Sequence, residues 1–233
     1  LHLALAAHGI CAGDKFIVPT YTFVASVEVG EYMGAEPILV DSEPDTFNLD
    51  LDQVEEKLAQ DTHGRIKAII PVHFGGQSVN MERVNELAKQ YDLFILEDAA
   101  HAVETVSNTE KVGNTNHAAA FSFYANKNIT TGGEGGALAT NDKVLADKVR
   151  RLSLHGMNKD GWKRFSLGGK WTYDVSELGY KYNMTDISAS FGLEQLTHIN
   201  DWHACRLEIV KCYNANLSNI GGLILPKHAC GKV

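Results

Sequence analysis

The feature that most constrains the fold is a repeated alternation of short apolar runs with amphipathic helical segments. The runs that we expect to form strands are residues 15–19, 37–40, 66–72, 93–97, 119–124 and 136–140. These runs are continuously apolar rather than alternating, which is typical of parallel strands covered by helices on both faces. The sequence therefore predicts an α/β fold with a mostly parallel sheet and right-handed crossovers.

The segments between these runs carry helical signals. We expect helices at residues 22–33, 50–60, 141–154, 185–200 and 202–220, and another that carries the apolar stripe Val84, Leu87, Ala88 and Tyr91. Asp50 is expected to cap the helix that follows it. Residues 156–183 are irregular and rich in glycine, lysine and aromatic residues, and connections of this length are often functional.

Both ends of the sequence indicate a fragment. The first ten residues, LHLALAAHGI, are typical of the end of a helix that stops at Gly9 and whose start lies before residue 1. The last residues, LPKHACGKV, stop without an obvious closing element.

Charge and cysteine content narrow the class of protein. The formal net charge is -8, which argues against nucleic acid as a partner. The four cysteines form no C-x-x-C pair, so free thiols in a reducing cytoplasm are the simpler interpretation. No apolar stretch reaches the length of a membrane-spanning helix. We therefore expect a cytoplasmic protein with neither nucleic acid nor membrane as a partner.

Chemically active side chains follow several of the expected strands. They are His73 after 66–72, Glu97, Asp98 and His101 at the end of 93–97, and Ser122 and Lys127 at the end of 119–124. In an open α/β sheet, ligands bind beyond the carboxyl ends of the strands. A carboxylate, imidazoles, a hydroxyl and an amine are therefore expected at one edge of the sheet.

Several common sites fit this set poorly. A phosphate-binding loop places its lysine after the glycines, whereas Lys127 precedes them, and Pro19–Tyr21 replace the glycines that a dinucleotide site needs after the first strand. The G-x-S-x-G motif of serine hydrolases is absent. Glu97, Asp98 and His101 lack a clear further ligand, so we expect no metal site.

The remaining chemistry is that of a lysine that binds pyridoxal phosphate (PLP) covalently, with an aspartate paired to the pyridine nitrogen. A carboxylate at the end of a buried strand favours the protonated ring, which is the better electron acceptor. Lys127 would reach the cofactor from another strand's loop. Gly132, Gly133, Gly135 and Gly136 would let the backbone approach the cofactor closely.

Five segments carry a resemblance to a known family. They are GDKFIVPTYTFVASVEVGEYMGAEPILVDSEPDTFNLD, IKAIIPVHFGGQ, ILEDAAHAV, FSFYANKNITTGGEGGALATND and ELGYKYNMTDISASFGLEQL. In this order they resemble the DegT/DnrJ/EryC1/StrS family of sugar aminotransferases, over roughly residues 13–200. The resemblance implies the large domain of a fold type I PLP enzyme at residues 1–200, truncated at its N-terminus. Residues 201–233 would be a connecting helix and the start of a smaller C-terminal domain that is mostly absent.

The resemblance also assigns roles at the cofactor. Lys127 matches the lysine that binds the cofactor covalently and moves the proton between cofactor and substrate. Asp98 matches the partner of the pyridine nitrogen, and Ser122 the hydroxyl that holds the phosphate. Phe23 matches an aromatic residue that stacks on the ring, and Ala100 would line the other face.

Two further positions concern the ring hydroxyl and the partner subunit. His101 stands where the family often has glutamine, near the ring hydroxyl. Asn183 matches an asparagine that reaches the phosphate of the neighbouring subunit's cofactor, so a homodimer with shared active sites is implied. The family's phosphate-binding Gly/Ser-Thr pair would lie before residue 1. We therefore expect the chain as given to bind the cofactor weakly, if at all.

Plainer interpretations remain for the individual residues. Lys127 alone would be typical of a solvated loop lysine, Asp98 of a turn cap, and Ser122 of a small strand residue. Phe23 and His101 could be packing residues, and we interpret His73 as a core or supporting histidine outside the catalytic set. The late residues His198, His203, Cys205 and Cys212 are interpreted as structural. Trp162, Phe165, Trp171 and Tyr173 could contact a sugar or nucleotide, or cover a partner subunit.

The resemblance implies an aminotransferase that converts a nucleotide-linked keto sugar to an amino sugar, as in polysaccharide biosynthesis. Glutamate would be the amino donor, the cofactor would alternate between PLP and pyridoxamine phosphate (PMP), and a 4-keto-6-deoxy sugar is favoured over a 3-keto sugar. A sugar dehydratase of the same family is a second hypothesis, although such enzymes typically carry histidine where Lys127 stands. An aromatising synthase of the same family and a non-catalytic binding or regulatory fragment are two further hypotheses.

Overall fold

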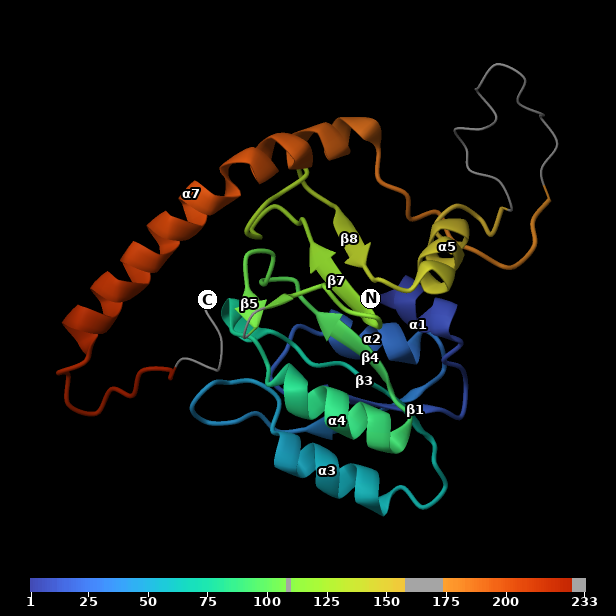
Figure 1. The fold of residues 1–233 in the computed structure, drawn as a ribbon, viewed down its shortest axis with the longest axis horizontal. Coiled ribbons are helices and arrows are strands. Elements are labelled where there is room, and N and C mark those ends of the chain that lie inside the picture. Colours follow the sequence, from blue (N-terminus) through green and yellow to red (C-terminus); the bar gives the residue numbers. More distant parts are fainter. Residues whose placement is uncertain (108–109, 158–173, 228–233) are drawn as a thin grey trace.

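A six-stranded sheet forms the centre of the protein, as the computed structural model shows for residues 1–107, 110–157 and 174–227 (Figure 1). Its strands are β1 (Lys15–Pro19), β2 (Glu36–Val40), β3 (Ile66–Ile69), β4 (Phe94–Asp98), β7 (Ala118–Ser122) and β8 (Gly136–Ala139), in the order β2-β1-β3-β4-β7-β8. The strands from β2 to β7 pair in parallel, and β8 pairs antiparallel to β7. The predicted mostly parallel α/β sheet is therefore confirmed.

Helices cover both faces of the sheet. α1 (His2–His8), α2 (Ala25–Glu31) and α5 (Lys143–Leu152) contribute to one apolar cluster, which includes Phe94 and Leu96 of β4. α3 (Leu51–Gln60) and α4 (Met81–Tyr91) contribute to a second cluster, which includes Ile95. Side chains that alternate along β4 thus enter opposite layers, as the pleat of a strand requires.

Local signals place the helix ends as predicted. The Asp50 side chain accepts hydrogen bonds from the backbone N–H groups of Asp52 and Gln53 at the start of α3. Gly9 ends α1 in the left-handed conformation, with φ of 100°. In α4, Val84, Leu87 and Ala88 of the predicted stripe are buried.

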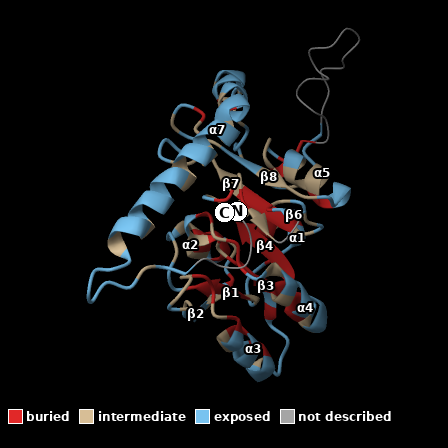
Figure 2. Cartoon of the chain, turned by 60° about the vertical axis from the view of Figure 1, so that its left-hand side comes forward, coloured by how far each residue is buried: buried red, intermediate tan, exposed pale blue. Residues whose placement is uncertain are grey.

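The two helices expected at 185–200 and 202–220 are one continuous helix, α7 (Asp186–Leu217), which corrects the prediction. Neither glycine nor proline occurs at the junction Asn200–Trp202, so nothing there interrupts the helical hydrogen bonds. The domain boundary predicted after residue 200 lies inside this helix and stays a prediction. Figure 2 shows α7 almost entirely exposed, and Gly192 is its buried residue among those described.

The shorter elements were not predicted. A 3-10 turn, η1 (Phe74–Gly76), follows β3, and two-residue strands β5 (Val106–Ser107) and β6 (Glu110–Lys111) pair antiparallel. In the irregular region, isolated bridges join Leu154 to Lys181 and Met157 to Val175. The aromatic residues Trp162, Phe165, Trp171 and Tyr173 lie outside the described residues.

Two findings bear on the other sequence predictions. The described cysteines, Cys11, Cys205 and Cys212, are free and exposed. Within the described ranges, no helix is long and apolar enough to cross a membrane.

Candidate active site at the carboxyl ends of β4 and β7

Asp98 ends β4 as a buried carboxylate with a fixed orientation. Its Oδ2 accepts a 2.7 Å hydrogen bond from the Ser26 hydroxyl on α2, and its Oδ1 accepts one of 3.1 Å from the Ala100 backbone N–H. Asp98 is only 7% exposed. Both oxygens of this buried carboxylate therefore have a hydrogen-bond donor.

Lys127 lies in the loop that follows β7, the strand next to β4. Asp98 pairs with Ala120 across the two strands, so the chain leaves both at the same edge of the sheet. The Lys127 amine lies 3.0 Å from Nε2 of His101, three residues beyond Asp98. His101 thus connects the segment that carries the aspartate with the loop that carries the lysine.

The environment of His101 favours a neutral ring. Partial burial lowers the pKa of His101, the nearby Lys127 charge lowers it further, and Asp98 opposes both. A neutral imidazole can accept a hydrogen bond from the lysine ammonium through Nε2, and its proton is then on Nδ1. The amine and the imidazole are therefore in contact at the sheet edge, and the Asp98 carboxylate is near enough to act on the charge of the imidazole.

Ser122 and the glycine turn complete the β7 side of the site. Ser122 is half-buried, and its hydroxyl accepts a 3.4 Å hydrogen bond from the Tyr124 N–H. Gly132 and Gly133 have φ of 87° and 147°, and residues with a side chain rarely adopt such backbone angles. A Cβ at Gly135 would lie 2.0 Å from Thr131 Oγ1. The turn after the lysine therefore depends on glycine at these positions.

The other predicted site residues differ in how closely they lie to Asp98 and Lys127. Ala100 is beside Asp98, as its hydrogen bond shows. Phe23 precedes α2 and is 76% exposed, and its carbonyl accepts a hydrogen bond from the Ser26 N–H. Asn183 is exposed and accepts a hydrogen bond from Lys181. Among the described contacts, none joins Asn183 to Lys127 or Asp98 of the same chain.

Asn183 lines a cavity of about 830 Å³ at the α1 side of β8. Its lining residues are Leu1, His2, Leu3, Ala4, Ala120, Phe121, Glu134, Gly135, Gly136, Ala137, Leu138, Val149, Ser153, Tyr182, Asn183, Met184, Thr185 and Ser188. The cavity therefore reaches the strand end that precedes Ser122 but does not include Lys127.

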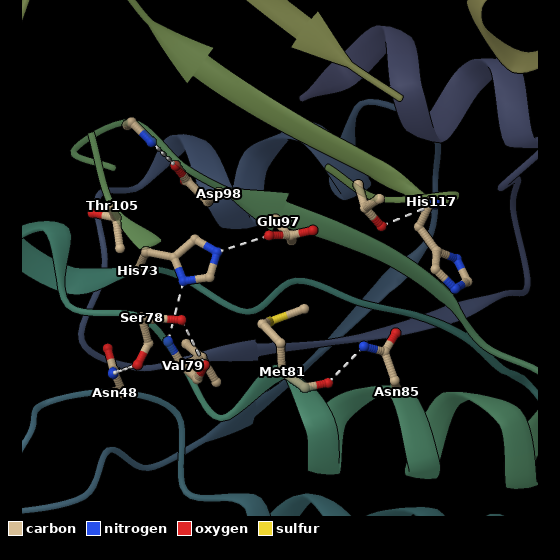
Figure 3. A network of polar contacts seen from close by, with 12 residues as sticks. Asn48, His73, Ser78, Val79, Met81, Asn85, Glu97, Asp98, Thr105 and His117 are labelled. Atoms are coloured by element: carbon tan, nitrogen blue, oxygen red, sulfur yellow. Dashed lines mark hydrogen bonds and ion pairs between the residues drawn. The ribbon is translucent and has the colours of Figure 1, made fainter. Parts of the chain in front are cut away.

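A buried hydrogen bond between His73 and Glu97 supports β4 on the face of the sheet opposite to Asp98 (Figure 3). Nε2 of His73 lies 3.0 Å from Oε2 of Glu97, and Nδ1 of His73 accepts a hydrogen bond from the Val79 N–H. The His73 backbone N–H also donates to the Asp98 carbonyl, at 3.1 Å. These contacts agree with the interpretation of His73 as a supporting histidine.

Two sets of contacts could not be predicted from the sequence. One is Ser26, whose only signal is that a small polar residue shares the buried face of α2 with Val29 and Gly30. The other joins Glu104 and Asn128 to Arg206 on α7, for which the sequence holds no local signal.

No group of three or more histidine, cysteine, aspartate or glutamate side chains arranged to hold a metal ion occurs in the described part of the chain.

The chain is similar to several known proteins. SpsC, the spore coat polysaccharide biosynthesis protein of Bacillus subtilis, is 45% identical over 97% of this chain and 57% of the relative. GDP-perosamine synthase of Caulobacter vibrioides is 40% identical over 98% of this chain and 57% of the relative. The structure of Spr1654 from Streptococcus pneumoniae in its PMP form matches with a TM-score of 0.82 and 33% identity, over 94% of this chain and 58% of that one.

The sheet order and these matches define the class of fold as the large domain of a fold type I PLP enzyme. The family model described as the DegT/DnrJ/EryC1/StrS aminotransferase family matches residues 1–231. The chain belongs to this family. It spans about 57% of the length of the curated relatives that it matches.

Proposed function

We propose that the full-length protein is a PLP-dependent aminotransferase that converts a nucleotide-linked keto sugar to an amino sugar. The observation that carries the proposal is the Lys127 amine and the Asp98 carboxylate at adjoining strand ends, with His101 between their segments. The 40% identity to a GDP-perosamine synthase supports a nucleotide-linked sugar as substrate.

The residues present fit the cofactor. When bound, PLP draws electrons from the substrate carbon into its ring, most effectively when the ring nitrogen is protonated. Asp98 would hold that proton, because Ser26 and Ala100 fix its buried carboxylate in one direction. The Lys127 amine would hold the cofactor covalently and then, once released, carry the proton at its Nζ atom.

The remaining predicted residues would hold the rest of the cofactor. Ser122 would bind the phosphate, Phe23 and Ala100 would cover the two ring faces, and His101 would lie near the ring hydroxyl. The 76% exposure of Phe23 leaves its ring free to contact a ligand. His101 would orient the Lys127 amine through the contact at 3.0 Å.

We further propose a homodimer with shared active sites. α7 exposes apolar side chains that a partner subunit would cover. They are Ile187, Phe191, Leu193, Leu196, Trp202, Ile209, Val210 and Tyr213. Asn183 is exposed and has no described contact with Lys127, which suits a residue that reaches the partner's cofactor. Free, exposed thiols suit the cytoplasm as the location.

For the substrates, we propose a 4-keto-6-deoxy sugar or a close relative, and glutamate as amino donor. The similarity to SpsC supports a place in polysaccharide biosynthesis. Residues 1–200 would form the cofactor-binding large domain, and the chain from residue 201 would lead into the smaller domain.

The test is spectroscopic and uses the full-length protein. PLP is added, the visible spectrum is recorded, and glutamate is then added. Colour that bleaches with glutamate supports an aminotransferase, colour that does not respond favours another PLP chemistry, and absence of colour overturns the proposal. Lys127→Ala should abolish the colour, whereas Lys148→Ala, on α5, should not. Colour that persists in Lys127→Ala would show that the lysine is wrongly assigned.

A further inference from the structure

α7 contacts the loop that carries Lys127 through a closed set of polar contacts. Arg206 Nη1 lies 2.9 Å from Glu104 Oε1, and Arg206 Nη2 donates to the Asn128 carbonyl at 3.0 Å. Asn128 Nδ2 donates in turn to Glu104 Oε2 at 2.7 Å. We name Glu104, Asn128 and Arg206 the Arg206 clamp.

Burial makes the Arg206 clamp stronger than an ordinary surface ion pair. The Glu104 side chain is 6% exposed, and that of Arg206 is 42% exposed. A buried carboxylate without a partner is strongly unfavourable, whereas exposed ion pairs contribute little. Both Glu104 oxygens have donors in the Arg206 clamp. Loss of Arg206 would therefore leave a buried charge with the Asn128 amide as its remaining described donor.

The Arg206 clamp joins the two segments that form the candidate active site. Asn128 directly follows Lys127, and Glu104 lies three residues after His101. The forked guanidinium contacts both segments at once, which suits the planar arrangement of its donors. The separation between the Lys127 loop and the segment after Asp98 is thus set in part by a residue on α7.

A second contact holds the far end of the same loop. Gln195 Oε1 on α7 accepts a 2.7 Å hydrogen bond from the Thr130 N–H. Thr131 packs so closely on α7 that a Cβ at Gly192 would lie 2.9 Å from Thr131 Cγ2. Figure 1 shows α7 passing along the loop that follows β7. Residues 128–131 are therefore fastened to α7 at both ends.

We propose that Arg206 is a positioning residue that holds the Lys127 amine in its reactive place through Asn128 and Glu104. This inference rests on the proposed function, because it concerns the reactivity of the lysine toward PLP. Residues misplaced by about 1 Å can cost about a hundredfold in rate. Removal of the Arg206 clamp should thus lower the reactivity of Lys127 without touching the cofactor directly.

The test compares Arg206→Ala with Lys211→Ala in the full-length protein. Lys211 is the matched control, since it forms an exposed ion pair with Glu208 on the same helix. Hydrogen–deuterium exchange of residues 126–131 is measured without cofactor. Capture of PLP at Lys127 is measured by borohydride reduction and mass spectrometry.

For Arg206→Ala, we expect exchange to rise and capture to slow, each by about tenfold, since hydrogen bonds to charged groups are lost. Lys211→Ala should match the unaltered protein in both measurements. In turnover, kcat should fall while KM changes little, because the substrate is not contacted. Wild-type exchange and capture in Arg206→Ala would overturn the inference.

Arg206→Lys covers the case in which Arg206→Ala does not fold. The lysine keeps a positive charge beside Glu104 but lacks the fork, so capture should slow by about threefold. Wild-type capture in a folded Arg206→Lys variant would then decide against the inference. If the unaltered protein captures no PLP at Lys127, the proposed function fails. The exchange measurement still tests the Arg206 clamp in that case.

Discussion

The Ser26 hydroxyl donates a 2.7 Å hydrogen bond to Asp98 Oδ2 across 72 residues of sequence, which joins the buried face of α2 to the end of β4. The Thr22 hydroxyl lies 2.8 Å from the Ser26 hydroxyl, so the Ser26 side chain is itself held in place. The orientation of the carboxylate thus depends on a helix that follows the first strand of the sheet.

Replacing Ser26 by alanine should lower the free energy of unfolding by about 1–3 kcal/mol, because a buried carboxylate oxygen loses its donor. Denaturant unfolding measures the change. Ser190→Ala is the control, since the Ser190 hydroxyl is exposed on α7 and donates to its own helix. Equal stability of the two variants would show that the Ser26 contact contributes nothing.

Gly30→Ala should destabilise the protein despite the better helix propensity of alanine. A Cβ at Gly30 would lie 2.1 Å from the ring of Phe16, which is fully buried and cannot move aside. Overpacking costs about 1–3 kcal/mol, and at so short a distance the upper part of this range applies. The better helix propensity of alanine offsets only about 1 kcal/mol of this loss of stability.

Thermal and denaturant unfolding test the Gly30 prediction. Gly221→Ala is the matched control, because its Cβ would meet no atom within 4 Å. A Gly30→Ala variant more stable than the unaltered protein would contradict the packing of α2 on β1.

His73→Ala should cost about 1–3 kcal/mol of stability, because the buried Glu97 carboxylate loses its hydrogen-bond donor. The side chains of the pair are 0% and 5% exposed. His198→Ala breaks an exposed histidine–glutamate pair on α7 and should cost at most about 1 kcal/mol. Denaturant unfolding of both variants makes the comparison, and similar losses would refute the role of burial.

Stability should fall as the pH drops below about 6.5. Burial lowers the pKa of His117, and burial together with the charges of His117 and Lys148 lowers that of His8. The folded state therefore binds fewer protons than the unfolded state between each lowered pKa and the ordinary value. The free energy of unfolding accordingly rises with pH across that window and is fully restored above it.

Unfolding measured at a series of pH values checks this sign. His8→Gln and His117→Gln should each reduce the slope between the lowered pKa and about pH 6.5. A slope of opposite sign, or one that both variants leave unchanged, would contradict the prediction.

Strands and their order along the chain could be predicted because continuous apolar runs are a local signal. The rule that ligands bind beyond the carboxyl ends of parallel strands predicted that Asp98 and Lys127 share one edge of the sheet. Asp98 ends one strand, and Lys127 follows its neighbour. The continuity of α7 could not be predicted, because a helix exposed around most of its surface has no clear apolar stripe near Asn200 and Asp201. The sequence around these two residues is therefore typical of a junction between two helices.

The supporting contacts of the site depend on residues that are distant in sequence. Arg206 and Glu104 are separated by 102 residues, and no periodicity or motif links them. Only the folded arrangement shows that a helix late in the chain contacts the loop of Lys127.

The antiparallel pairing of β8 with β7 has a consequence for the reach of Lys127. The Phe123 N–H donates to the Gly135 carbonyl at 2.8 Å, so the segment between them is closed at its base like a hairpin. Residues inserted at Gly132–Gly133, on the β8 side of this segment, would come after the contacts that hold Asn128 and Thr130 to α7 and would leave the amine where it is. Residues inserted between Ser122 and Lys127 would lengthen the link between the amine and β7, and so change its position relative to Asp98 on the neighbouring strand.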